Sequence, residues 1–225
     1  MAGHRDPVFG LDAHHPTHTH TFSLRAAALR GRRRRPEREG ENGTVTSDPG
    51  TELVDVLDSC GLAVRVAPRS EVRRLRLLHA ATAVAVRRSD GCLYVHRRTE
   101  TKDIYPGAYD CWAGGVIASG ETPLEGARRE LAEELGVRGV PLRPLGVVRW
   151  SDSRAHAIYH VFETVWDGPI VPQVTEIAWG DWWTPATLAE RLAAPDFVFV
   201  PDGRHLLAVT GLLQPHLVRH GGPGV

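Results

Sequence analysis

The residues best suited to chemistry are four acidic side chains within residues 115–137. Glu130, Glu133 and Glu134 stand at spacings of i, i+3 and i+4, which would place their carboxylates on one face of a helix. Glu121 precedes them in the same segment. Like charges this close raise one another's pKa unless a cation neutralises them. Because hard divalent cations prefer oxygen ligands, the pattern predicts a site for Mg²⁺ or Mn²⁺.

Several neighbours complete this predicted site. Gly114 has no side chain, so its backbone carbonyl could approach the cation, and Arg129 could hold Glu133 in place at i+4. Hydrolysis also needs a general base that takes a proton from water, and the candidates are Glu133 and Glu176. The expected metal ligands are therefore Gly114, Glu130, Glu133 and Glu134, and the expected catalytic residues are Arg129, Glu130, Glu133 and Glu176.

A helix with strong end signals should carry these acidic residues. Thr122 is a good N-cap, Pro123 suits the first helical position, and Glu125 completes a capping box. Gly136 supplies the left-handed residue that ends the helix after Leu135. One stripe of apolar side chains should face the core, namely Leu124, Ala127, Leu131 and Leu135.

The whole segment matches a fixed pattern of Gly, five residues, Glu, seven residues and then Arg-Glu-Leu-x-Glu-Glu-x-Gly-Val. At ordinary residue frequencies, such a match arises by chance on the order of 10⁻⁸ times per starting point. This pattern is the Nudix box, so the domain resembles the Nudix superfamily. The resemblance implies an α+β fold, the α/β/α sandwich around a mixed β-sheet. It also implies hydrolysis of a nucleoside diphosphate linked to another moiety.

A second resemblance lies upstream of the box. Residues 77–81 and 97–107 look like the Nudix subgroup near isopentenyl-diphosphate isomerase, and the likeness spans roughly residues 52–210. In that enzyme an Arg and a Lys grip the substrate diphosphate, and they match Arg98 and Lys102. A forked guanidinium and an ammonium both suit phosphate oxygens. Arg98 and Lys102, the latter the only lysine in the chain, are therefore the expected substrate-binding residues.

The groups that transfer protons in the isomerase are missing. Its catalytic Cys would fall at Gly114, its nearby metal-binding His at Val116, and its Glu-x-Glu pair near Ala155 and Ala157; only its strand histidine has a counterpart, His79. The hydrolase carboxylates are intact. We therefore expect a metal-dependent pyrophosphohydrolase that cleaves a nucleoside diphosphate derivative or a related organic diphosphate. The alternatives are an isomerase-like enzyme, a non-catalytic Nudix ligand sensor and an RNA-processing enzyme.

Sequence periodicity divides the chain into three parts. Residues 1–50 are rich in His and Arg without a sustained period and predict a disordered tail, residues 51–215 form the Nudix domain, and residues 216–225 form a flexible tail. Within the domain we expect a hairpin at 54–66, a short helix capped by Ser70, and strands at 79–86, 92–95, 143–150, 156–166 and 179–183. Helices at 185–192 and 201–213 should pack with the box helix on one mixed sheet.

The amino-acid composition limits which binding partners and which cellular compartment we expect. Basic and acidic residues balance at 27 each, so the molecule lacks the electrostatic field of a nucleic-acid binder. The cysteines number three, without a metal or redox spacing, which fits a reducing cytoplasm. No apolar run approaches the roughly 20 residues that span a bilayer, and the N-terminus has no apolar signal segment. We expect a cytoplasmic protein that binds a small-molecule diphosphate and no membrane, with a homodimer left open.

Overall fold

The computed structural model describes residues 49–214 of the chain. Of the predicted tails at 1–50 and 216–225, only Pro49 and Gly50 fall inside this range. The elements in chain order are η1 (Pro49–Thr51), β1 (Leu53–Leu57), β2 (Ala63–Pro68), α1 (Arg69–Leu75), β3 (His79–Arg87), β4 (Leu93–Arg98), β5 (Tyr109–Asp110), β6 (Trp112–Ala113), α2 (Pro123–Leu135), β7 (Arg143–Ser151), β8 (His156–Val165), β9 (Ile177–Trp183), α3 (Pro185–Ala193) and α4 (Pro201–Thr210).

The strands of the described range form one mixed sheet organised around β3. β3 pairs in parallel with β8 from His79 opposite Ala157 to Arg87 opposite Val165. It pairs antiparallel with β1, β4 and β6. β9 extends the sheet beside β4, and β7 extends it beside β8. The parallel pair among antiparallel neighbours confirms the predicted mixed sheet.

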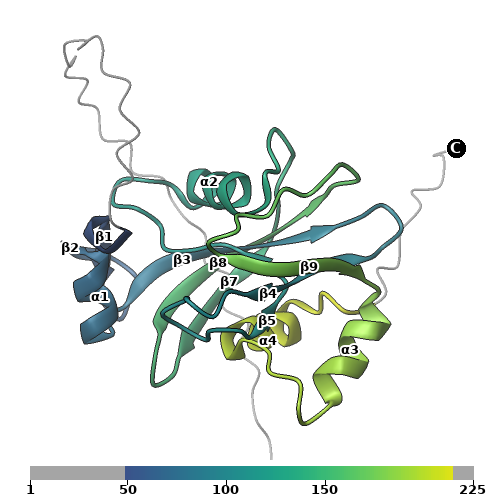
Figure 1. The fold of residues 1–225 in the computed structure, drawn as a ribbon. Helices are drawn as coiled ribbons and strands as arrows, with labels where there is room; N and C mark the ends of the chain where they lie inside the picture. The colour runs from purple at the N-terminus through teal and green to yellow at the C-terminus, as the bar shows by residue number, and fades with distance from the viewer. Residues whose placement is uncertain (1–48, 215–225) are drawn as a thin grey trace, which may run out of the picture. The chain divides into compact units, whose positions relative to one another are not determined.

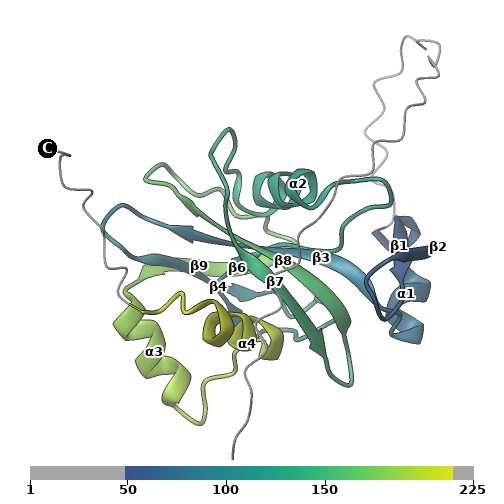
Figure 2. The same ribbon diagram turned by 180° about the vertical axis from the view of Figure 1, so that it is seen from behind.

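Helices cover both faces of this sheet, because side chains alternate along each strand. On β3, Val84 and Val86 join the core beneath α2, whereas Ala83 and Ala85 join the core that contains side chains of α3 and α4. Figures 1 and 2 show α2 on one face and both C-terminal helices on the other. The predicted α/β/α sandwich is confirmed.

The local signals of α2 act as predicted. The Thr122 hydroxyl accepts a bond from the Glu125 amide at 3.3 Å, and the Glu125 carboxylate accepts one from the Thr122 amide at 2.9 Å. Gly136 ends the helix in the left-handed region at φ 70°. Ala127, Leu131 and Leu135 are buried as expected, but Leu124 remains 37% exposed, because the buried face of α2 begins only at Gly126.

Some sequence-based expectations were wrong in detail. Ser70 lies inside α1 and does not cap it, since the N-cap is Pro68 and no side-chain bond is made there. The two-residue strands β5 and β6 were not expected, because pairs of residues carry no readable period. α4 ends at Thr210 rather than near residue 213. None of the helices between residues 49 and 214 has the length and apolarity needed to cross a bilayer.

Candidate active site

The buried side of α2 carries two carboxyl groups beside a glycine loop. Glu130 and Glu134 are 7% and 8% exposed, and the Gly114 amide donates to Glu134 Oε2 at 3.1 Å. Side chains at the glycines would collide: a Cβ on Gly115 would lie 2.5 Å from Glu130 Oε1, and one on Gly114 would lie 2.1 Å from the Thr82 carbonyl oxygen. The loop therefore brings bare backbone against both carboxyls.

Burial makes these two carboxyls costly to ionise. Desolvation raises the pKa of Glu134, and the neighbouring Glu130 raises it further. Desolvation also raises the pKa of Glu130, although Arg129 opposes the shift. An adjacent divalent cation would favour the ionised form of both groups. The chemistry of this donor set thus fits a hard cation.

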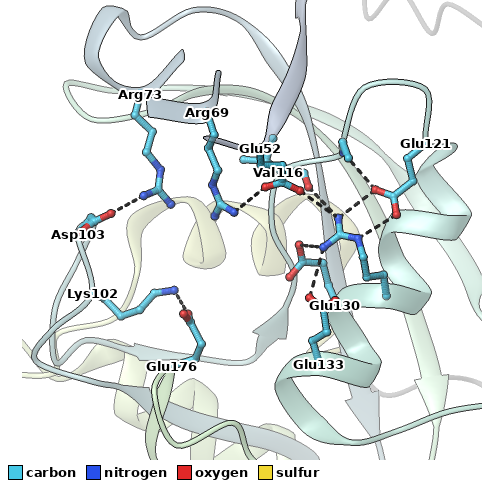
Figure 3. Close-up of polar contacts among 12 residues, drawn as sticks. Glu52, Arg69, Arg73, Lys102, Asp103, Val116, Glu121, Glu130, Glu133 and Glu176 are labelled. Carbon is cyan, nitrogen blue, oxygen red and sulfur yellow. Dashed lines mark hydrogen bonds and ion pairs between the residues drawn. The ribbon is translucent and has the colours of Figure 1, made fainter. Parts of the chain in front are cut away.

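Arg129 pairs with three acidic residues around the loop, Glu121, Glu130 and Glu133, whose side chains are labelled in Figure 3. Its guanidinium donates to both oxygens of Glu121 at 2.9 Å and to Glu130 at 2.8 Å. It also donates to the Val116 carbonyl oxygen at 3.2 Å. The predicted contact with Glu133 exists but is the longest of the set at 3.4 Å. Arg129 therefore ties the loop to the helix, with Glu121 as its main partner.

Glu133 differs from the other two box carboxylates. Its side chain is 53% exposed, against 10% for Glu130. Within residues 49–214, no group of three or more His, Cys, Asp or Glu side chains is arranged as a metal site. The structure thus brings Glu130 and Glu134 together at the Gly114 loop and leaves Glu133 at the open side, held by Arg129.

The opposite side of the site carries the two predicted phosphate ligands. Lys102 forms an ion pair with Glu176, so the structure brings the candidate base Glu176 to this site from the segment before β9. Burial lowers the pKa of Lys102, and Arg98 lowers it further. The Arg98 guanidinium donates to the Ile104 carbonyl oxygen through Nη2 at 3.0 Å and Nε at 3.3 Å, which orients it from the end of β4.

Sequence reasoning missed two further cations, Arg69 and Arg73 of α1. Figure 3 shows both side chains on the same side of the site as Lys102, facing the acidic residues of α2. Arg69 pairs with Glu52 at 2.9 Å, and Arg73 pairs with Asp103. Burial lowers the pKa of Arg73, and Arg69 adds to the shift. Their i, i+4 spacing on a short predicted helix was the available signal.

Two adjoining cavities meet at these cations. One, the carboxylate cleft, is lined by Gly114, Glu130, Glu133, Glu134 and Glu176. The other, the inner cavity, is lined by residues that include His79, Tyr105, Asp110, Trp112, Tyr159 and Asp202. Both are also lined by the cation cluster, which we define as Arg69, Arg73, Arg98 and Lys102. A bound molecule could therefore reach from the carboxylates past the cations into the inner cavity.

Among the described residues, no cysteine lines either cavity. Cys111 is 2% exposed and packs in the core on the α3 and α4 side, while Gly114 and Val116 lie among the residues that line the inner cavity. His79 lines the inner cavity, and its Nδ1 lies 2.9 Å from the Leu77 carbonyl oxygen. Burial lowers the pKa of His79, which favours the neutral form of its ring.

Known proteins match both the sequence and the fold. The NUDIX domain model matches residues 77–203. The uncharacterized Nudix hydrolase orf19 of Rhodococcus erythropolis is 44% identical over 175 residues, covering 73% of this chain and 95% of its own length. The uncharacterized Nudix hydrolase YfcD of Escherichia coli K12 is 38% identical over 159 residues, covering 71% and 86%.

A solved structure agrees with these matches. The crystal structure of DR0079 from Deinococcus radiodurans superposes with a TM-score of 0.62 at 29% sequence identity, covering 71% of this chain and 99% of its own. The matched residues 77–203 contain the acidic helix, the glycine loop, Arg98 and Lys102. Fold, site geometry and sequence matches thus agree, and the chain belongs to the Nudix family of hydrolases, enzymes that act on acid anhydrides.

Proposed function

We propose that this protein is a Mg²⁺- or Mn²⁺-dependent pyrophosphohydrolase that cleaves the diphosphate linkage of a nucleoside diphosphate derivative or a related organic diphosphate. One observation carries the proposal: buried Glu130 and Glu134 line the same cleft as the cation cluster. Carboxylates that need a cation and cations that need an anion therefore share one space. A diphosphate bound together with a divalent ion would satisfy both sides.

Each wall of the cleft has its own task. Glu130, Glu134 and Glu133, with the backbone of Gly114, would hold the ion. A bound divalent ion polarises the diphosphate and lowers the pKa of a bound water. Arg98 and Lys102 would bind the phosphate oxygens and stabilise the leaving phosphate. Their neighbours Arg69 and Arg73 from α1 add charge to the same grip.

Arg129 and the general base complete the proposed machinery. Arg129 acts as a positioning residue, since its bonds to Glu121 and Glu130 fix the loop against α2. The base is Glu133 or Glu176, and both line the carboxylate cleft. Glu133 is the more exposed and is held by one 3.4 Å contact with Arg129, whereas Glu176 is engaged by Lys102. This difference favours Glu133 as the group that takes the proton of water.

The proposed kinship with isopentenyl-diphosphate isomerase is confined to phosphate binding. Arg98 and Lys102 line the cleft, which supports a role in phosphate binding, while Gly114 and Val116 would replace the isomerase Cys and His. Isomerisation would thus lack its proton-transfer groups. A non-catalytic sensor is disfavoured because all box carboxylates are present. Deleting residues 1–50 tests the RNA alternative, which requires that RNA binding be lost.

A panel of diphosphates tests the proposal. Nucleotide sugars, dinucleotides, nucleoside diphosphates and isopentenyl diphosphate are incubated with the protein, with Mg²⁺, with Mn²⁺ and with EDTA, and released phosphate or monophosphate is measured. We expect release from at least one compound, only with metal, and its loss in Glu134→Gln. The matched control is Glu190→Gln on the exposed side of α3. Interconversion of isopentenyl diphosphate without phosphate release, or full turnover in Glu134→Gln, would overturn the proposal.

A further inference from the structure

A third cavity lies between the end of α1 and the turn that joins β7 to β8. We call it the arginine groove, and its polar lining includes Ser70, Arg73, Arg74, Arg76, Ser153 and Arg154. Asp103 is the one carboxylate among its described lining residues, and it is already paired with Arg73. The groove therefore carries a surplus of positive charge, which favours an anionic ligand.

Three of these arginines are not neutralised by a carboxylate. The Arg74 guanidinium has no partner among the described residues. Arg76 donates to a neutral group, the Asp152 carbonyl oxygen, and the Arg154 guanidinium lies over the Tyr105 ring, 5.3 Å from its centroid. The nearby Asp152 carboxylate accepts instead from the Tyr105 hydroxyl and from two backbone amides of the turn. The charges of Arg74, Arg76 and Arg154 are thus available to a ligand.

The backbone at Arg76 is unusual for an arginine. Arg76 ends α1 in the left-handed region, at φ 50° and ψ 43°, where glycine is the usual residue at a helix end. The bond from its guanidinium to the Asp152 carbonyl oxygen joins the end of α1 to the turn between β7 and β8. Arg76 therefore ties together the two elements that form the sides of the groove.

Helix electrostatics explains only part of this cluster of cations. The helix dipole stabilises cations in the last turn of a helix, which accounts for Arg73 and Arg74 of α1. Arg154 comes from a different segment, the turn between β7 and β8. Like charges that are brought together from two elements repel one another. An anion bound between the two sides would offset this repulsion.

The arginine groove adjoins the inner cavity, since the two share three arginines, and His156 also lines the inner cavity. The inner cavity itself offers both donors and acceptors. Among the described residues, its buried atoms without a partner include the donor Arg69 Nε, the acceptor Asp202 Oδ1 and the Thr82 hydroxyl, which can act as either. The groove differs because its charge selects one kind of ligand, an anion.

We propose that the arginine groove is an anion site separate from the carboxylate cleft, and that it binds a phosphate group through Arg74, Arg76 and Arg154. A guanidinium presents paired N–H donors to phosphate oxygens, and a tetrahedral phosphate accepts donors from both sides of the groove. The group is either a free phosphate ion or a phosphomonoester of the molecule whose diphosphate lies at the cation cluster. The second source rests on the proposed function, and the first does not.

Phosphate binding tests the site without metal and without turnover. Radiolabelled inorganic phosphate is dialysed to equilibrium against the full chain in EDTA at low ionic strength, and bound phosphate is measured. The groove variant is Arg74→Met/Arg154→Met, and Arg98→Met changes the cation cluster. The control is Arg128→Met/Arg138→Met, which removes two exposed arginines in and after α2. Thermal melts check that each variant is folded.

We expect wild type to bind phosphate at two separate places, the groove and the cation cluster. Arg74→Met/Arg154→Met should weaken binding only at the groove, by at least about tenfold, the loss of a charge-assisted hydrogen bond. Arg98→Met should weaken binding only at the cation cluster, and the control should bind like wild type. Equal phosphate binding in Arg74→Met/Arg154→Met and wild type overturns the inference, and so does loss of all binding in Arg98→Met.

Two dinucleotides distinguish the sources of the phosphate group. NAD⁺ and NADP⁺ share a diphosphate, and NADP⁺ carries one additional phosphomonoester. If the groove binds a phosphate of the same molecule, NADP⁺ displaces labelled phosphate from both places and NAD⁺ only from the cation cluster. If neither dinucleotide displaces phosphate from the groove, the ligand is a free ion. Displacement from the groove by NAD⁺ would make the groove part of the diphosphate site and overturn the inference. Because no hydrolysis is measured, failure of the proposed function leaves these outcomes unchanged.

Discussion

The two walls of the carboxylate cleft differ in how the chain builds them. The acidic wall comes from one continuous segment, the glycine loop and α2, which Arg129 ties together through Glu121 and Glu130. The cationic wall is assembled from α1, the end of β4 and the loop after it. Local order builds the first wall and tertiary packing builds the second. The acidic residues lie on one helix and the loop before it, so their positions relative to one another are set locally. The positions of the cationic residues depend on how separate elements pack in the whole domain.

A change of the proposed general base, which lies on the acidic wall, should produce the largest loss of activity. Glu133→Gln keeps the size of the side chain and removes its ability to take a proton. We expect kcat to fall by about 10² to 10⁴, the usual contribution of a general base, with KM little changed. Steady-state kinetics with Mg²⁺ measures both. Glu176→Gln is the paired variant, and a larger kcat loss there than in Glu133→Gln would move the base to the cationic wall.

Removing a cation from the other wall should weaken substrate binding. Arg98→Met retains the apolar stem and removes the guanidinium, so kcat/KM should fall about ten- to a hundredfold, the value of a charge-assisted bond. Arg97→Met is a close control, because Arg97 is the adjacent residue of β4 and pairs with Glu100. Equal losses in the two variants would show that strand charge in general, and not Arg98, supports the reaction.

Because the inner cavity contains the buried carboxyl group of Asp110, we expect the stability of the folded protein to depend on pH. Burial and then Asp202 raise the pKa of Asp110 from 3.8 to about 7. The folded state therefore holds this proton more tightly than the unfolded chain, and stability falls as pH rises from about 4 to about 7. Asp110→Asn cannot ionise, so its free energy of unfolding should fall less over this window. Urea unfolding at several pH values, without metal, measures it; an unchanged slope would contradict the assignment.

The smallest expected effect concerns the helix that carries the acidic wall. Thr122→Ala removes the cap bond to the Glu125 amide, which should lower the free energy of unfolding by about 1 kcal/mol and leave kcat/KM unchanged at low temperature. Thr122→Ser keeps the cap oxygen and should restore stability. A loss of activity in Thr122→Ala without a loss of stability would mean that the cap, and not the carboxylates alone, sets the site geometry.

The contrast between the acidic wall and the cationic wall explains which parts of the site could be predicted from the sequence. The spacing of the box residues, the N-cap at Thr122 and the helix end at Gly136 are local sequence signals. The sequence alone could therefore predict the helix that carries the acidic residues. Arg98 and Lys102 were predicted as phosphate ligands from a family resemblance. In the structure both residues line the carboxylate cleft. Arg69 and Arg73 were missed because only the packing of α1 against β1 and β2 turns them toward the carboxylates. The proximity of Asp110 and Asp202 in the inner cavity could not be predicted, since the two residues are brought together only by the folded chain.

Manganese binding tests the central claim most directly, because Mn²⁺ reports its own coordination by electron paramagnetic resonance without any substrate. Wild type and Glu190→Gln should bind Mn²⁺ with the same affinity, and Glu134→Gln should bind it at least about tenfold more weakly, since a ligand of the buried carboxylate pair is lost. Mg²⁺ should compete for the same site. Equal Mn²⁺ affinity in Glu134→Gln and wild type would contradict the assignment of the acidic wall as the metal site.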